Sequence, residues 1–179
     1  MTNGFTFRGA HSSKYCIHLQ SQSRVLLPPR REGNIVIPGE SGCYDGVAGK
    51  VYDTRAESFQ CGFVRPEGMS VPQVCRELAY WLSGTGRLIL DKEPDKYYLA
   101  RLSGAPPMEQ HLHSGAFTLT WTFNPPFAFG RTVTLPVHDG ENPIAYKGTA
   151  ETPCLLVLRN VSKRTISNLT ITAIKRSGL

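Results

Sequence analysis

One amphipathic helix stands in a chain that is otherwise broken into short apolar runs. Between residues 71 and 82, apolar side chains recur at the three- and four-residue spacing of a single helical face. They are Val71, Val74, Cys75, Leu78, Ala79 and Leu82. Ser70 and Gln73 occupy the positions of a capping box, and Gly84 offers a left-handed stop. The pattern predicts a helix over residues 71–83, which must bury its apolar stripe on a sheet.

The remaining sequence predicts a mainly β chain. Its 17 glycines and 13 prolines separate short apolar runs, which is the pattern of strands and turns. We expect strands at residues 4–7, 15–19, 24–27, 34–38, 47–52, 58–64 and 115–124. The last is the clearest, because Phe117, Leu119 and Trp121 alternate with threonines, as on a half-buried antiparallel strand.

A β-hairpin is predicted directly after the helix. Residues 87–90 and 97–102 carry the apolar side chains of two strands, and residues 91–96 between them are charged except for Pro94. Proline and alternating charges are typical of a solvated turn. We therefore expect a hairpin over about residues 87–102, with a polar tip.

The C-terminal residues predict a change of domain. Residues 154–158 and 169–174 are apolar enough for two strands, with a polar stretch between them. Two strands alone do not bury a core. We expect residues 1–147 to form the first domain, and residues 148–179 either to begin a second domain or to add a strand pair that packs on the first.

Bulk composition excludes several classes of protein. The 179 residues are 40% hydrophobic and 19% charged, which indicates a folded domain. No apolar run is long enough for a transmembrane helix, and the N-terminus lacks the pattern of a secretory signal, so we expect folding in a cytoplasm without membrane insertion. The net charge is +6, but no dense basic block interleaved with aromatic residues favours nucleic-acid binding.

The cysteines do not predict a metal or redox site. The five are widely scattered and none forms a C-x-x-C pair; they are Cys16, Cys43, Cys61, Cys75 and Cys154. We expect them to be small buried residues kept reduced.

Two clusters of side chains are candidate chemical sites. His111 and His113 are spaced for one side of a strand, but the sequence places no third metal ligand beside them. Asp91, Glu93 and Asp95 resemble a catalytic carboxylate cluster, yet a solvated turn offers no cleft across which two carboxylates could act. We expect these carboxylates to pair with nothing.

The other candidates are weaker. His11, His18 and His138 are isolated in the sequence and are expected at the surface or satisfied in the core. No nucleophile elbow, Walker loop or dinucleotide fingerprint is present. The sequence therefore predicts no catalytic residue, no metal site and no cofactor.

Several segments, in order, resemble one family. They are Phe5-Thr6-Phe7 through His11-Ser12-Ser13, Leu27-Pro28-Pro29, Ile37-Pro38-Gly39 with Gly42-x-Tyr44-Asp45, residues 76–82, residues 86–101, residues 123–127 and residues 148–153. The chain resembles the siphophage distal tail proteins, which form the baseplate hub between tail tube and tip. The resemblance spans about residues 4–153, and its most specific part is the helix followed by the motif D-x-E-P-D-K-Y-Y.

The resemblance implies a β-sandwich-like or barrel-like N-terminal domain with one helix and a protruding hairpin at about residues 87–102, and a structural role without catalysis. Members of the family form a hexameric ring around a channel that DNA traverses as cargo, in contact with the tail tube protein, the tape measure protein and a tail-associated lysin or tip protein. The implied location is the virion tail tip, after assembly in the bacterial cytoplasm. Members commonly add a C-terminal galectin-like β-sandwich, of which residues 148–179 would be a truncated start.

Two other functions remain open. A carbohydrate- or receptor-binding module of the phage tip would need an exposed aromatic platform, whereas Trp81 and Trp121 are better core candidates. A hydrolase would depend on His111, His113 and the carboxylates of residues 91–95.

Overall fold

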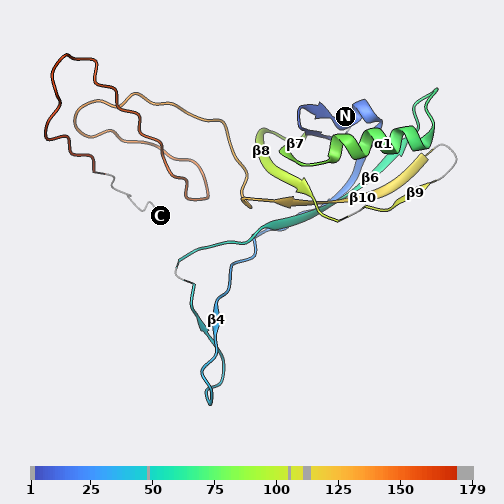
Figure 1. The fold of residues 1–179 in the computed structure, drawn as a ribbon, viewed down its shortest axis with the longest axis horizontal. Helices are drawn as coiled ribbons and strands as arrows, with labels where there is room; N and C mark the ends of the chain where they lie inside the picture. Colours follow the sequence, from blue (N-terminus) through green and yellow to red (C-terminus); the bar gives the residue numbers. More distant parts are fainter. Residues whose placement is uncertain (1–2, 48, 105, 111–113, 173–179) are drawn as a thin grey trace. The chain divides into compact units, whose positions relative to one another are not determined.

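The chain divides into two units, residues 1–137 and 138–179. The first unit is organised around an eight-stranded antiparallel sheet that carries one helix (Figure 1). The computed structural model describes residues 3–47, 49–104, 106–110 and 114–172. The strands of the sheet are β1 (Phe5–Phe7), β2 (Ala10–His11), β3 (Ile17–Ser23), β6 (Arg55–Val64), β7 (Thr85–Leu90), β8 (Glu93–Leu102), β9 (Met108–Gln110) and β10 (Ser114–Phe123). A short 3-10 helix, η1 (Ser12–Tyr15), links β2 to β3.

The sheet curls until its two ends meet. The strand order is β2-β1-β7-β8-β10-β6-β3, with β9 also paired to β10. At the closing edge the Leu19 amide of β3 donates to the Asn3 carbonyl oxygen at 3.0 Å, and the Asn3 side-chain amide donates to the Leu19 carbonyl oxygen at 3.2 Å. These two bonds join the first segment of the chain to the last strand of the order. The sandwich-like or barrel-like fold predicted from the sequence is confirmed.

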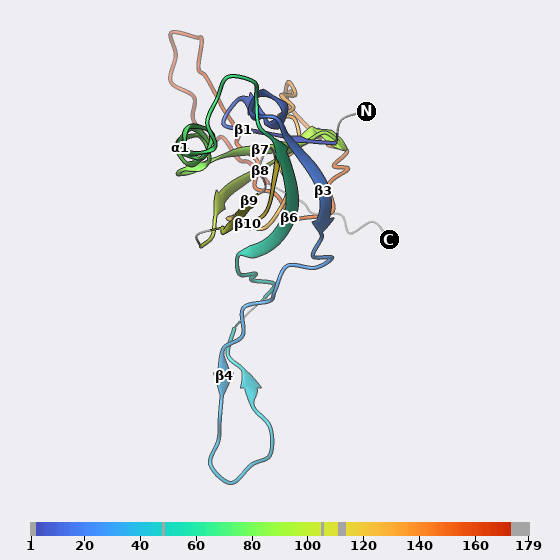
Figure 2. The ribbon, with the colours of Figure 1, turned by 90° about the vertical axis from the view of Figure 1, so that its right-hand side faces the viewer.

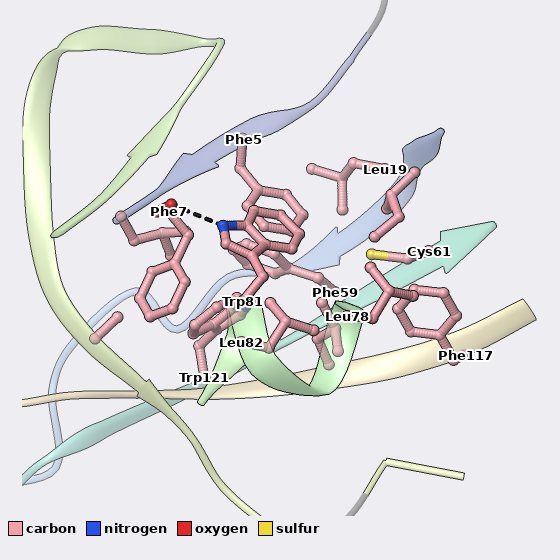
Figure 3. Close-up of a cluster of buried hydrophobic side chains, with 14 of the residues drawn as sticks. Phe5, Phe7, Leu19, Phe59, Cys61, Leu78, Trp81, Leu82, Phe117 and Trp121 are labelled. Atoms are coloured by element: carbon pink, nitrogen blue, oxygen red, sulfur yellow. Dashed lines mark hydrogen bonds between the residues drawn. The ribbon is translucent and has the colours of Figure 1, made fainter. Parts of the chain in front are cut away.

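The core lies inside this curl and combines a cluster of aromatic rings with aliphatic side chains (Figure 3). Trp121 of β10 is fully buried and contacts the rings of Phe5, Phe7 and Phe59 at centroid distances between 4.7 and 6.2 Å. Trp81 of the helix stacks on Phe5 and donates its indole N–H to the Phe7 carbonyl oxygen at 2.9 Å. Both tryptophans are core residues, as the sequence predicted.

The helix α1 (Val71–Leu82) covers the open side of the curl and ends one residue before the predicted bound. Its stripe buries Val74, Leu78, Trp81 and Leu82. The capping box is present: the Ser70 amide donates to the Gln73 side-chain oxygen at 2.9 Å. Gly84 has φ +84°, a left-handed conformation that favours glycine and turns the chain into β7.

The hairpin β7–β8 is confirmed, but its turn and placement differ from the prediction. The turn is only Asp91 and Lys92, and residues 93–96 belong to β8. Pro94 is tolerated there because the β7–β8 register shifts between Leu88 and Leu90, which releases it from the ladder. The hairpin is also part of the sheet, since β7 pairs with β1 and β8 pairs with β10.

A different segment leaves the sheet, and we call residues 24–54 the arm (Figure 2). It joins β3 to β6 and contains a separate two-stranded sheet of β4 (Asn34–Ile35) and β5 (Tyr44–Asp45). The strand expected at 34–38 is thus shortened, and those expected at 24–27 and 47–52 do not form among the described residues. A two-stranded ribbon has no facing layer on which apolar side chains could be buried.

The second unit has no regular structure in the part that is described. Residues 138–172 contain neither helix nor strand there, so the strand expected at 154–158 is absent. Its apolar side chains are exposed, including Leu155, Val157 and Val161. The division of the chain at residues 147 and 148 stays a prediction.

Candidate assembly surface

The structure describes one of the two predicted chemical clusters. His111 and His113 lie outside them. Within the described part, no three or more histidine, cysteine, aspartate or glutamate side chains gather where they could hold a metal ion.

The carboxylates after the helix have partners, so the expectation that they pair with nothing is wrong. Asp91 forms a hydrogen bond with His11, whose Nε2 lies 3.1 Å from Oδ1. Glu93 accepts hydrogen bonds from the Arg24 guanidinium at 2.6 Å and from the Tyr98 hydroxyl at 3.0 Å. His11 lies 80 residues from Asp91 along the chain, and Arg24 lies 69 residues from Glu93. The fold brings the two members of each pair together.

The Arg24–Glu93 pair fixes the point at which the arm leaves β3. The Glu93 hydrogen bond raises the pKa of Arg24, and the Arg24 guanidinium lowers the pKa of Glu93 below its ordinary value of 4.5. Both side chains are therefore charged at neutral pH. Arg24 also donates to the Tyr98 hydroxyl at 3.1 Å, which ties the first residue of the arm to the middle of β8.

A second charged pair lies at the point where the arm returns to the sheet. Arg55 and Glu57 of β6 are buried, with only 10% and 2% of their side chains exposed, and Arg55 Nε lies 3.3 Å from Glu57 Oε1. The Arg55 guanidinium covers the rings of Tyr98 and Phe123 at 5.2 and 5.0 Å. Gln22 of β3 donates to Glu57 at 2.9 Å. Charged contacts thus hold both ends of the arm.

Sequence reasoning missed this pair, although the signal was present. Side chains alternate across a strand, so Arg55 and Glu57 share a face with Phe59, Cys61 and Phe63. The burial of β6 follows that alternation over its whole length. The predicted strand began at residue 58 and left both charges outside.

The arm itself presents apolar side chains to solvent. Leu26, Leu27, Ile35, Val36 and Tyr44 are all more than half exposed. Contiguous exposed apolar surface of this kind marks interaction sites in folded proteins. The arm is therefore a candidate contact surface of this chain.

The face of the sheet opposite the core is rich in hydroxyl and amide groups. Ser58 and Thr120 are hydrogen bonded across β6 and β10 at 3.3 Å, and Ser21 of β3 donates to Gln60 at 2.8 Å. Ser103 and Thr122 form a further hydroxyl pair. This face is polar without a cluster of charges along β6 and β10.

The comparison with family models decides the class of the protein. The model described as "Phage tail protein RIFT-related domain" matches residues 11–122, which contain β2 to β9, most of β10, the helix and the arm. The chain belongs to this family. It is a component of phage tails, as the resemblance implied.

A solved structure with the same fold supports the family. The Dit protein of SPP1, whose structure is described as a paradigm of the hub adsorption apparatus in phages that infect Gram-positive bacteria, matches with a TM-score of 0.61 and 14% identity. The match covers 73% of this chain and 53% of that protein, so this chain spans about half its length. A comparison with curated proteins finds no match.

Other predictions are settled by exposure. Both tryptophans are buried, so neither forms the aromatic platform that a carbohydrate-binding tail protein would need.

Of the five cysteines only Cys61 is buried, and Cys43 and Cys154 are exposed, which corrects the expectation that all are small core residues. Burial raises the pKa of the Cys61 thiol to about 12. No helix in the described residues is long and apolar enough to span a membrane.

The Arg24–Glu93 contact predicts a pH-dependent stability. Because the folded-state pKa of Glu93 is below 4.5, its stabilisation is complete above pH 4.5 and is lost as the pH falls through the lower folded value. We expect Glu93→Gln to unfold at lower urea concentration than the wild type at pH 7, with the difference shrinking toward pH 3. Urea unfolding at several pH values measures this. Asp95→Asn, on the exposed part of β8, is the control and should show no such trend.

Proposed function

We propose that this chain is a structural component of the tail hub, a homo-oligomeric ring of six copies that joins the tail tube to the tail tip. The observation that carries the proposal is the family match over residues 11–122, and the fold likeness to a hub protein supports it. The proposed role is assembly, and no residue is assigned to catalysis.

The subunit has the unlike faces that a closed ring needs. A ring forms when each copy contacts its two neighbours through different surfaces whose rotation closes. Beyond Leu19, the outer edge of β3 has no neighbouring strand among the described residues, and the short strand β2 ends the other side of the sheet. Such edges accept strands from a neighbour, and the arm adds a further contact surface.

The proposed partners follow from the place of a hub. They are the tail tube protein, the tape measure protein and a tail-associated lysin or tip protein, with DNA only as passing cargo. The hydroxyl-rich face of β6 and β10 suits a channel wall, because it lacks the clustered cations that would retain phosphates. The protein would be assembled in the bacterial cytoplasm and located at the virion tail tip.

The C-terminal residues are assigned by proposal only. Residues 148–179 would begin a galectin-like β-sandwich, or form a strand pair that packs on residues 1–147. Either arrangement would cover apolar side chains that are exposed in the described residues, such as Leu155 and Val157.

The test is the oligomeric state of the purified chain. We expect mass photometry and light scattering to give a single species of six subunits, and negative-stain images to show rings with a central hole. A monomer at every concentration up to the highest soluble one, with no rings in the images, would contradict the proposal. Peptidoglycan-degrading activity in a zymogram would contradict the structural assignment.

A further inference from the structure

An apolar cleft lies between helix α1 and the sheet, and we call it the α1 groove. Its volume is about 600 Å³. The helix contributes Cys75, Leu78 and Leu82, and the strands contribute Leu102, Phe117 and Leu119. It is a cavity large enough for several apolar side chains.

The rim of the groove is cationic. Arg8 donates from Nη1 to the carbonyl oxygen of Ser83, a groove residue, at 2.7 Å, so its guanidinium is held at the end of α1. Arg101 is the one charged residue among those that line the groove. Neither arginine belongs to an ion pair recorded between described residues. The groove therefore suits an apolar segment that carries a negative charge.

The tip of the arm, residues 34–44, has that chemistry. Ile35, Val36 and Ile37 are 55%, 69% and 42% exposed. Between residues 34 and 44 the only charged side chain is Glu40. The other charges of the arm lie closer to the sheet and are largely paired with each other, as Arg30 is with Asp45. An isolated ribbon of this length is marginally stable in water, so we expect it to be ordered against a partner surface.

The arm cannot serve the groove of its own subunit without reversing direction. It rejoins the sheet at Arg55, which pairs with Phe123, whereas the groove residue Phe117 pairs with Cys61, farther along the same strands. In both views the arm runs away from α1 (Figures 1 and 2). An extended chain gains about 3.3 Å per residue, so the tip can reach about 50 Å from Ser23, more than the roughly 35 Å diameter expected of a domain this size.

We propose that the arm tip of one copy binds in the α1 groove of the next copy. The proposal rests on the oligomer proposed above and names the contact that holds it. Each copy offers one tip and one groove, so the contact is heterologous and can propagate around a closed ring. The carboxylate of Glu40 faces the arginines of the rim, and the isoleucine and valine side chains fill the apolar floor.

Two native cysteines make the contact measurable. Cys43 lies in the exposed tip and Cys75 lines the groove. With Cys16→Ser and Cys154→Ser in place, Cys61 remains unreactive because it is buried and its thiol pKa is raised to about 12. A short bismaleimide added to the assembled protein should then give a covalent ladder extending beyond dimers. Adding Cys43→Ser or Cys75→Ser should abolish every species larger than a dimer.

The outcomes separate the contact from the function. Rings without a Cys43–Cys75 ladder would overturn the contact and leave the hub in place, while neither rings nor ladder would overturn both. Dimers alone would overturn the contact, because they indicate an isologous pairing. A second variant tests whether the C-terminal segment occupies the groove instead. It keeps Cys75 and Cys154 and carries Cys43→Ser, and efficient cross-linking between its two cysteines would also overturn the proposal.

Charge reversal provides an independent test. Glu40→Arg in the two-cysteine background should lower the ladder yield several-fold, because an attractive contact with the rim becomes repulsive. Glu32→Arg is the matched control, since Glu32 is an exposed carboxylate of the arm outside the tip, and it should leave the yield unchanged. If Glu40→Arg gives the same ladder yield as the two-cysteine protein that keeps Glu40, the rim contact is absent and the proposed docking is overturned.

Discussion

Replacing Trp121 with alanine is expected to lower the free energy of unfolding by about 3–5 kcal/mol, the cost of removing a large buried aromatic side chain. Trp121 is fully buried, and its ring contacts Phe5 and Phe7 of β1 and Phe59 of β6. The three contacting rings belong to paired strands, which limits how far they can move into the vacated space. Domains of this size are stable by only about 5–15 kcal/mol, so the variant should be largely unfolded in mild denaturant.

Far-ultraviolet circular dichroism during urea unfolding measures this effect without depending on tryptophan fluorescence. Tyr80→Ala is the matched control, because Tyr80 is an aromatic residue of α1 that is 82% exposed. Its effect should stay within about 0.5 kcal/mol, as for most surface substitutions. A loss below about 1 kcal/mol for Trp121→Ala, against the usual cost of a core truncation, would show that the aromatic cluster does not hold the sheet together.

The parts of the fold that sequence reasoning found are those specified by local pattern. The stripe from Val71 to Leu82 has helical spacing and a capping box, so helix α1 could be placed within one residue. Strand β10 alternates aromatic residues and threonines, and its inward set became the core in the structure. In both elements the same residues determine the local conformation and the buried face, which is why the pattern was sufficient.

The parts that were missed depend on distant partners. Pro94 and its charged neighbours have the composition of a turn, yet a register shift against β7 keeps them in a strand. Residues 47–52 have the composition of a strand, but in the described part of this segment the pairing is limited to an isolated bridge between Tyr52 and Arg30. Composition reports what a segment prefers, whereas pairing depends on what lies opposite, and a single sequence does not record it.

The candidate surface was predictable only in part. A projecting hairpin was expected from the family resemblance, but the projecting hairpin is the arm and not residues 87–102. The contacts that direct the arm, Arg24 with Glu93 and Arg55 with Glu57, combine residues from β3, β6 and β8. They could not be paired before the strand order was known.

The second large effect is expected at the base of the arm. Arg55→Met should lower the free energy of unfolding by about 3–5 kcal/mol, because it leaves the Glu57 carboxylate buried without its cation. Only 2% of the Glu57 side chain is exposed, and the hydrogen bond that it accepts comes from the neutral amide of Gln22. The substitution also removes the cation from the rings of Tyr98 and Phe123. Urea unfolding at pH 7 measures the change.

Comparison with two further variants assigns the loss to the buried charge. Arg31→Met breaks an exposed ion pair with Asp53 in the same arm and should cost no more than about 1 kcal/mol, as surface pairs do. Arg55→Met combined with Glu57→Leu should recover much of the lost stability, since replacing both members of a buried pair by apolar residues removes the unpaired charge. If the double variant is instead less stable than Arg55→Met, the hydrogen bond from Gln22 to Glu57 contributes more than charge balance does. Since Arg55 is the first residue of β6 after the arm, we also expect Arg55→Met to loosen the direction of the arm, and hence to reduce ring formation more than Arg31→Met does.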